Sequence, residues 1–141
     1  MKRIIILISI MLLSIIGFSQ NYINQDKESI ILVKGSPDFK VDITEEVYYI
    51  AYKANETKYE LYYFDKSKVC YIYAVIDDYR YLTADVKDLN DNFIKLNETT
   101  WEYYMKDGRC VAKLTYFKSG FSILFTMLYE NKVNESIKTT L

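Results

Sequence analysis

The 141-residue sequence contains no histidine, and it has only one proline, one tryptophan, two cysteines and four glycines. Without histidine, the chain lacks the commonest general base and zinc ligand, and therefore also Ser-His and Cys-His nucleophile pairs. It also lacks a P-loop, a Gly-rich dinucleotide motif and a G-x-S-x-G nucleophile elbow. The net charge of −1 creates no field that would attract nucleic acid. We therefore expect a non-enzymatic protein that holds no cofactor or metal and binds no nucleic acid.

The composition is that of a folded protein. Half of the residues are apolar and 16% are aromatic, so the chain has ample surface to bury. Its length is that of one compact domain or two very small ones. We expect a single α+β domain over 20-130, followed by a polar tail over 131-141.

The N-terminus has the three-part plan of a secretory signal peptide. Two basic residues precede an apolar run over 4-16, and a Gly-Phe-Ser tripeptide over 17-19 follows. The apolar run is shorter than the roughly 20 residues that span a bilayer as a helix. We expect residues 1-19 to be removed and the chain to be exported to the periplasm or the outside of the cell, so that it meets the membrane only before cleavage. The alternative is an inner-membrane tether formed by uncleaved residues 4-18.

Two short helices are expected. Asn24 or Asp26 can cap the first, Gly35 suits the left-handed residue after a helix end, and Pro37 prevents continuation. The second follows an Asp-Asp pair and has apolar residues at spacings of four, three and four, which places them on one helix face. These residues are Leu82, Val86, Leu89 and Phe93.

Runs rich in Tyr, Val, Ile and Thr, separated by short polar breaks, predict antiparallel strands. The strongest two-residue hairpin signal is the Asp-Gly pair at 107-108. Strands are expected near 39-43, 46-54, 57-64, 69-76, 93-97, 100-106, 109-117 and 121-129. The order, one helix and about four strands given twice, predicts an antiparallel meander sheet with two short helices on one face. A duplicated helix-plus-four-strand unit, with repeats over 24-76 and 78-130, is one interpretation of this order.

A family resemblance follows from the first of these units. A short helix that runs into Gly35-Ser36-Pro37, and then strands with Tyr63-Phe64-Asp65 near the third turn, resembles a group of small envelope domains. They are related to β-lactamase inhibitor protein and to the small lipoprotein of the outer-membrane barrel assembly machinery. The match covers mainly residues 26-76, and the second half lacks the Gly-x-Pro turn. The resemblance implies a non-enzymatic, protein-binding fold and carries no catalytic residue across.

The two cysteines are Cys70 and Cys110. An even pair in an exported protein is a disulfide candidate. Each alternates with apolar residues along its expected strand, so both should face the core. The alternative is two buried thiols on strands that never meet.

Fifteen tyrosines are the most unusual feature of the composition. Adjacent pairs must send one ring to each side of a strand, so some rings should face solvent, where they would suit a protein or glycan partner. The alternatives are ordinary cross-strand packing and, for the tryptophan, a place in the core. The candidate binding face comprises Tyr48, Tyr49, Tyr62, Tyr63, Tyr71, Tyr73, Trp101, Tyr103 and Tyr104.

These patterns together predict an exported, non-catalytic binding or envelope-interaction module that uses a Tyr-rich sheet face. The alternative is a small-ligand carrier or small enzyme with a pocket between helix and sheet, marked by a cavity where polar groups converge. A third alternative, a membrane-tethered structural protein, requires that the N-terminal segment is retained.

Overall fold

The structure is a computed structural model that describes residues 22–106 and 108–129. The expected signal segment over 1-19, residue 107 of the expected hairpin turn and the tail over 131-141 lie outside the described residues. Each of the eight expected strands is present, with ends that differ by no more than two residues from the prediction. The elements in chain order are α2 (Lys27–Lys34), β1 (Phe39–Asp42), β2 (Tyr48–Lys53), β3 (Tyr59–Phe64), β4 (Cys70–Asp77), the 3₁₀ turn η1 (Tyr79–Tyr81), α3 (Leu82–Asn92), β5 (Ile94–Asn97), β6 (Thr100–Met105), β7 (Gly108–Phe117) and β8 (Gly120–Tyr129).

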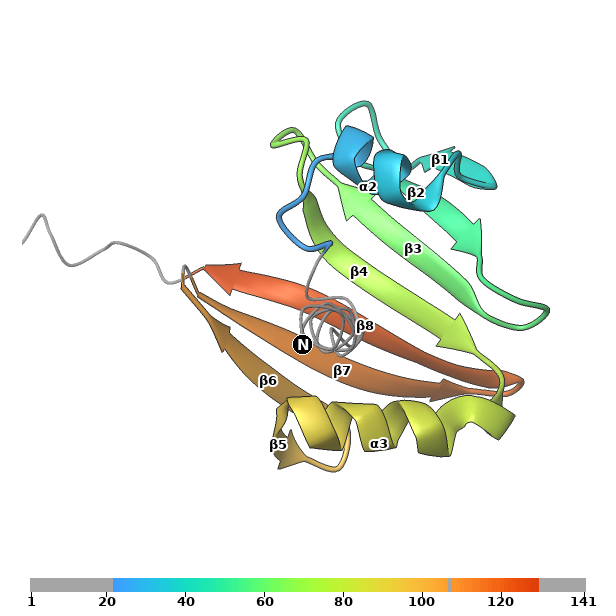
Figure 1. Cartoon of the computed structure of the whole chain (residues 1–141), viewed down its shortest axis with the longest axis vertical. Coiled ribbons are helices and arrows are strands. Elements are labelled where there is room, and N and C mark those ends of the chain that lie inside the picture. Colours follow the sequence, from blue (N-terminus) through green and yellow to red (C-terminus); the bar gives the residue numbers. More distant parts are fainter. Residues whose placement is uncertain (1–21, 107, 130–141) are drawn as a thin grey trace, which may run out of the picture.

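The eight strands form one antiparallel sheet in the order β1-β2-β3-β4-β8-β7-β6-β5 (Figure 1). Each half of the described chain is a helix followed by a four-strand meander, and the halves join where β4 pairs with β8. The edges of the sheet are therefore β1 and β5, both short and exposed along their length. The predicted α+β class with an antiparallel meander is confirmed.

Capping residues set both ends of α2 and the start of the 3₁₀ turn before α3. The Asp26 carboxylate accepts a hydrogen bond from the backbone N–H of Ser29 at 2.7 Å, and Gly35, with φ of 85°, follows the last residue of α2. Asp78 accepts from the N–H of Arg80 at 2.9 Å and so caps the turn that leads into α3.

The strand register assigns the core to one face of the sheet. A row of cross-strand partners that share this face runs from Tyr62 through Tyr73, Phe125 and Ala112 to Trp101, and all five are buried. Both described helices lie against this side of the sheet, which we call the helix face (Figure 1). Ile30 of α2 and Leu89 of α3 belong to the same hydrophobic core. The opposite side, the uncovered face, has no described helix against it.

The predicted disulfide is wrong. Cys70 lies on β4 and Cys110 on β7, and β8 runs between these strands. Neighbouring strands lie about 4.8 Å apart, so two spacings place the residues roughly 10 Å apart. A disulfide requires Cα atoms within about 7 Å. Both thiols are free and buried, as the alternative interpretation held, and burial raises the pKa of each to about 12.

Candidate functional site

The uncovered face is apolar over the first four strands. Cross-strand partners Ala51, Leu61, Ala74 and Leu124 form a continuous apolar row from β2 to β8. The alternating residues before and after them share this face. We call this surface the apolar face; it comprises Phe39, Val41, Tyr49, Ala51, Tyr59, Leu61, Tyr63, Ile72, Ala74, Ile76 and Leu124.

A hollow of about 300 Å³ opens on the apolar face. The methyl group of Ala51, which is buried, does not fill the space between larger neighbours on β1 and β3. Phe39 and Val41 on edge strand β1 are 54% and 40% exposed. The lining contains no charged residue: Phe39, Val41, Tyr49, Ala51, Tyr59, Leu61 and Ile76. Such a hollow suits an apolar group of a partner.

Two tyrosines continue the apolar face beyond the hollow. The rings of Tyr49 and Tyr63 are cross-strand neighbours with centroids 5.1 Å apart. Burial raises the pKa of Tyr63 above its ordinary value, because the phenolate would lose hydration. The hydroxyl is therefore neutral at physiological pH, and the pair presents apolar rings that carry hydrogen-bonding tips.

The other half of the uncovered face mixes polar side chains with the apolar side chains of Ile94, Val111 and Leu128. Buried Glu102 on β6 accepts hydrogen bonds from Arg109 Nη1 at 2.8 Å and from the Tyr104 hydroxyl at 2.9 Å. Lys113 and Thr115 on β7 lie exposed on the same side. The apolar face thus ends at β8.

The structure divides the predicted binding residues between the two faces. The adjacent pairs do point to opposite sides, and Tyr49, Tyr63 and Tyr104 lie on the uncovered face. Tyr71 is half-buried in the irregular register between β3 and β4. The remaining five are helix-face residues. Tyr48 stacks on Phe64, Tyr103 packs edge-on against Phe93, and Tyr62, Tyr73 and Trp101 are fully buried.

Tyr62, Tyr73 and Trp101 therefore cannot form an exposed face, and their assignment to it is corrected, whereas Tyr48 is half-buried and Tyr103 is exposed, both on the helix face. Trp101 takes the core position of the alternative interpretation, and its indole N–H donates to Asn90 Oδ1 of α3 at 2.8 Å. Sequence reasoning missed the aliphatic part of the site. The sequence indicates this part of the site where consecutive strand residues are both apolar, as at Ile50 and Ala51, because one of the two must then face away from the core.

A charged network lies between α2 and the helix face. The Lys34 ammonium group lies 5.3 to 5.7 Å from the ring centroids of Tyr22, Tyr52 and Tyr62. The Glu60 carboxylate pairs with Lys34 and accepts from the Tyr62 and Tyr73 hydroxyls at 3.2 and 3.3 Å. Burial raises the pKa of both tyrosines well above the ordinary value. The network attaches α2 to β3. Its carboxylate, ammonium and hydroxyl groups bind one another.

A second charged cluster lies beneath α3. Asp85 is 7% exposed, and one of its carboxylate oxygens is 3.9 Å from Lys58 Nζ. The other oxygen, like one of Asp88, is buried and has no hydrogen-bond partner in the structure. Burial raises the pKa of both carboxyl groups, more than Lys58 lowers it. Within 22–106 and 108–129, no three His, Cys, Asp or Glu side chains are placed to hold a metal ion.

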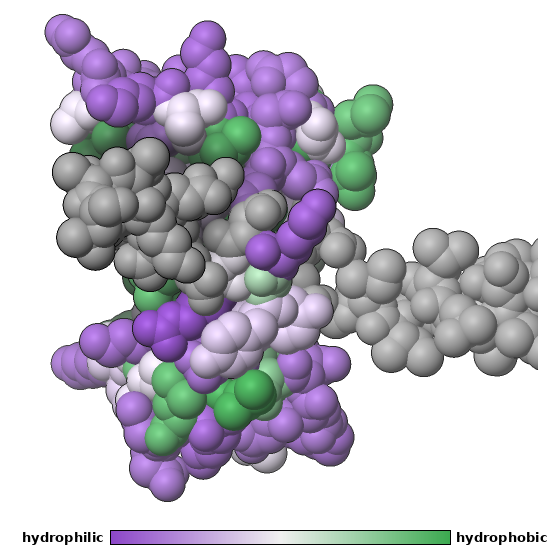
Figure 2. Space-filling model, turned by 90° about the vertical axis from the view of Figure 1, so that its left-hand side faces the viewer, coloured by the Kyte–Doolittle hydropathy of each residue, from purple (hydrophilic) through white to green (hydrophobic). Residues whose placement is uncertain are grey.

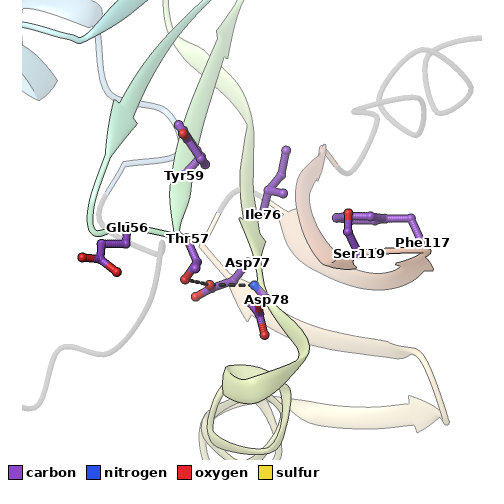
Figure 3. Close-up of a pocket in the computed structure, with 8 residues that line it drawn as sticks. All are labelled: Glu56, Thr57, Tyr59, Ile76, Asp77, Asp78, Phe117 and Ser119. Carbon is purple, nitrogen blue, oxygen red and sulfur yellow. Dashed lines mark hydrogen bonds between the residues drawn. The ribbon is translucent and has the colours of Figure 1, made fainter.

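Two further hollows lie near α3 and at the end of β4. A groove of about 560 Å³ lies along α3 and includes Val86, Leu114 and Tyr116. The smaller hollow, of about 270 Å³, shares Tyr59 and Ile76 with the apolar one. At its base Asp77 accepts from Thr57 Oγ1 and from the backbone N–H of Asp78, both at 2.7 Å (Figure 3). Internal hydrogen bonds thus occupy this carboxylate.

Comparison with protein-family models, with curated proteins and with solved structures finds no significant match to this chain. Among the described residues, no helix has both the length and the apolar character needed to cross a membrane. The functional argument therefore depends on the geometry of the molecule.

Proposed function

We propose that the protein is a non-catalytic binding module whose contact surface is the apolar face. The observation that carries this proposal is the hollow over Ala51, ringed by apolar side chains and open to solvent beside edge strand β1. Large contiguous apolar patches are rare on monomers and mark interaction sites. The aromatic residues around the hollow are of the kind that supplies most binding energy at interfaces.

The partner that this surface fits is a protein that presents a large apolar side chain. A flat sheet face with one hollow matches a single anchoring group surrounded by shallow contacts. The tyrosine hydroxyls at the rim can exchange hydrogen bonds with a partner's backbone, or with a glycan in the alternative form of this proposal. We propose further that the chain is exported after loss of residues 1-19, which would place the partner in the envelope or outside the cell.

Two finer proposals concern the origin of the fold. The chain would be a duplication of a helix-plus-four-strand unit, which the repeated element order and the central β4–β8 pairing support. It would also be a distant relative of the envelope domains that its first half resembles. The turn formed by Gly35, Ser36 and Pro37 after α2 supports this relationship.

The double variant Tyr49→Ser/Tyr63→Ser tests the binding surface. Capture of envelope proteins by the immobilised chain should fall tenfold or more, about 1.4 kcal/mol, if these rings contact the partner. The control is Tyr116→Ser, which removes an exposed ring from the helix face. Equal capture by the wild type, the double variant and Tyr116→Ser would contradict the proposal. Circular dichroism melting of each variant separates lost binding from lost folding.

A second candidate function is carriage of a small ligand, and the groove of about 560 Å³ along α3 favours it. Its lining combines apolar Leu82 and Val86 with charged Lys87 and Lys95. A thermal-shift screen of small metabolites tests this candidate. A ligand that raises the Tm of the wild-type chain but not of Val86→Trp, in which the indole fills the groove, would support it.

A further inference from the structure

One side of α3 packs on the sheet, and the other side faces water. Leu89 is buried and Val86 is half-buried on the inner side, where the indole N–H of Trp101 also donates to Asn90 Oδ1 at 2.8 Å. Figure 2 shows many hydrophilic residues over the lower part of the molecule, where α3 lies in Figure 1. The helix is therefore held by a few inner side chains.

The ends of α3 add little to its stability. Asp78 caps the 3₁₀ turn that precedes the helix, but Tyr81 at the N-cap of α3 provides no capping side-chain hydrogen bond within the described chain. The last turn contains Asp91 and no basic residue, although the C-terminal end of a helix favours positive charge. Segments of this kind open locally at lower free energy than core strands do.

The charges beneath α3 do not balance. The charged groups that face Asp85 and Asp88 are Lys58 on β3, Asp77 on β4, and Lys87 and Asp91 on α3 itself. The last two pair with each other on the outer side of the helix. Among the described residues, this leaves the ammonium group of Lys58 beside three carboxyl groups, those of Asp77, Asp85 and Asp88.

Two of these carboxyl groups lack the contacts that a buried charge requires. Asp85 is 7% exposed; one of its oxygens has no hydrogen-bond partner, and the other is 3.9 Å from Lys58 Nζ, beyond hydrogen-bonding distance. Asp88 accepts from Asn92 Nδ2 at 3.0 Å through one oxygen, and its other oxygen is buried without a partner. The first turn of a helix favours the charge of Asp85, but burial outweighs this effect and raises the pKa of both carboxyl groups.

We propose that α3 is a pH-dependent lid over Trp101, held closed while Asp85 and Asp88 are protonated and loosened when they ionise. Opening returns the two carboxylates to water. It also removes one wall of the groove of about 560 Å³ that Val86 and Leu114 line, and so enlarges the apolar surface there. The inference does not depend on the proposed function, because α3 lies on the opposite side of the sheet from the apolar face.

The direction of the effect follows from linkage. A carboxyl group whose pKa is higher in the closed than in the open state favours closure when it is protonated. Its contribution is fully present below the ordinary Asp pKa and is lost as pH rises through the raised pKa of the closed state. The lid therefore closes in acid and loosens toward neutral pH.

Hydrogen exchange measures how often α3 opens, because a protected N–H exchanges only when its hydrogen bond breaks. The probes are the backbone amides of α3 and the indole N–H of Trp101, the single tryptophan of the chain. The amides of β4 and β8 report on the core of the sheet. NMR protection factors from about pH 4 to about pH 8 remove the intrinsic pH dependence of exchange and cover the range above the ordinary Asp pKa.

In the wild type, the α3 amides and the Trp101 indole should be less protected than β4 and β8 at every pH. Their protection should fall about tenfold or more as pH rises, because each unit of pKa difference changes the opening equilibrium tenfold. Asp85→Asn/Asp88→Asn should lose most of this fall, while the control Asp91→Asn, which alters an exposed carboxylate of the same helix, should keep it. Circular dichroism melting checks folding; should the double variant melt early, Asp85→Asn alone replaces it.

Three outcomes overturn the inference. If the α3 amides are as strongly protected as those of β4 and β8, the helix leaves the sheet only when the whole domain unfolds. If α3 protection does not change with pH in the wild type, the lid does not respond to protons. If the fall persists in Asp85→Asn/Asp88→Asn, other groups cause it. The Tyr49→Ser/Tyr63→Ser capture experiment tests the apolar face separately from all three.

Discussion

Replacement of Asp85 by Asn should stabilise the protein at neutral pH. The Asp85 side chain is buried, and one of its oxygens has no hydrogen-bond partner. An unsatisfied buried polar atom costs about 1 to 3 kcal/mol, and more when the group is charged. The attraction of Lys58 at 3.9 Å offsets part of this cost. Since burial dominates and raises the carboxyl pKa, we expect Asp85→Asn to gain about 1 kcal/mol at pH 7.

The sign of the pH dependence follows from linkage. A carboxyl group whose pKa is higher in the folded than in the unfolded state favours folding when it is protonated. Its contribution is fully present below the unfolded pKa and is lost as pH rises through the folded pKa. The wild type should therefore lose stability as the pH rises from the ordinary Asp pKa through the raised pKa of Asp85. Asp85→Asn should lose less stability over the same pH range, since the amide cannot ionise.

Guanidinium unfolding at a series of pH values from about 3 to about 8 measures both effects, because ΔG is linear in denaturant. The control is Asp91→Asn, an exposed partner of Lys87, which should change stability by less than about 0.5 kcal/mol. Destabilisation of Asp85→Asn at pH 7 would refute the reasoning. It would show that the Lys58 attraction outweighs the loss of hydration.

Two further predictions concern buried groups. Thiol titration of denatured, unreduced protein should find two free thiols, and the native protein should react slowly, since both cysteines are buried and their pKa is about 12; fewer than two would indicate that the strands separate and a disulfide forms. Lys34→Met should destabilise by about 2 kcal/mol because it leaves the partly buried Glu60 without its charge partner, and the double variant Lys34→Met/Glu60→Leu should recover much of this loss. Chemical denaturation measures the free energy of unfolding of the single and the double variant. Additive losses would show that Lys34 and Glu60 act independently.

Most of the fold was predictable because its signals are local. Polar breaks separate runs of strand-forming residues, and Asp26 and Gly35 mark the ends of α2 by their hydrogen-bonding and conformational preferences. The disulfide prediction failed because it depended on strand order. The inward phase of both cysteines is readable from alternation, but the insertion of β8 between β4 and β7 is a long-range pairing that no local pattern encodes.

The candidate site was predictable only in part for a related reason. Adjacent tyrosines must face opposite sides, but which member faces the helices depends on the packing of α2 and α3. Tyr62 is buried against Tyr22 and Tyr52, while its neighbour Tyr63 lies on the uncovered face. The hollow depends on the small side chain of Ala51 beside Phe39 and Leu61, residues distant in sequence that only the sheet register brings together.

Site-specific photocrosslinking in the cell tests the central claim, that the apolar face is a binding surface, most directly. A benzoylphenylalanine in place of Val41 lies at the rim of the hollow, and one in place of Leu128 lies on the same side of the sheet outside it. The account predicts a discrete adduct from position 41 and none from position 128. The adduct mass distinguishes a second copy of the chain from another protein. No adduct at position 41, or equal adducts at both positions, would contradict the account.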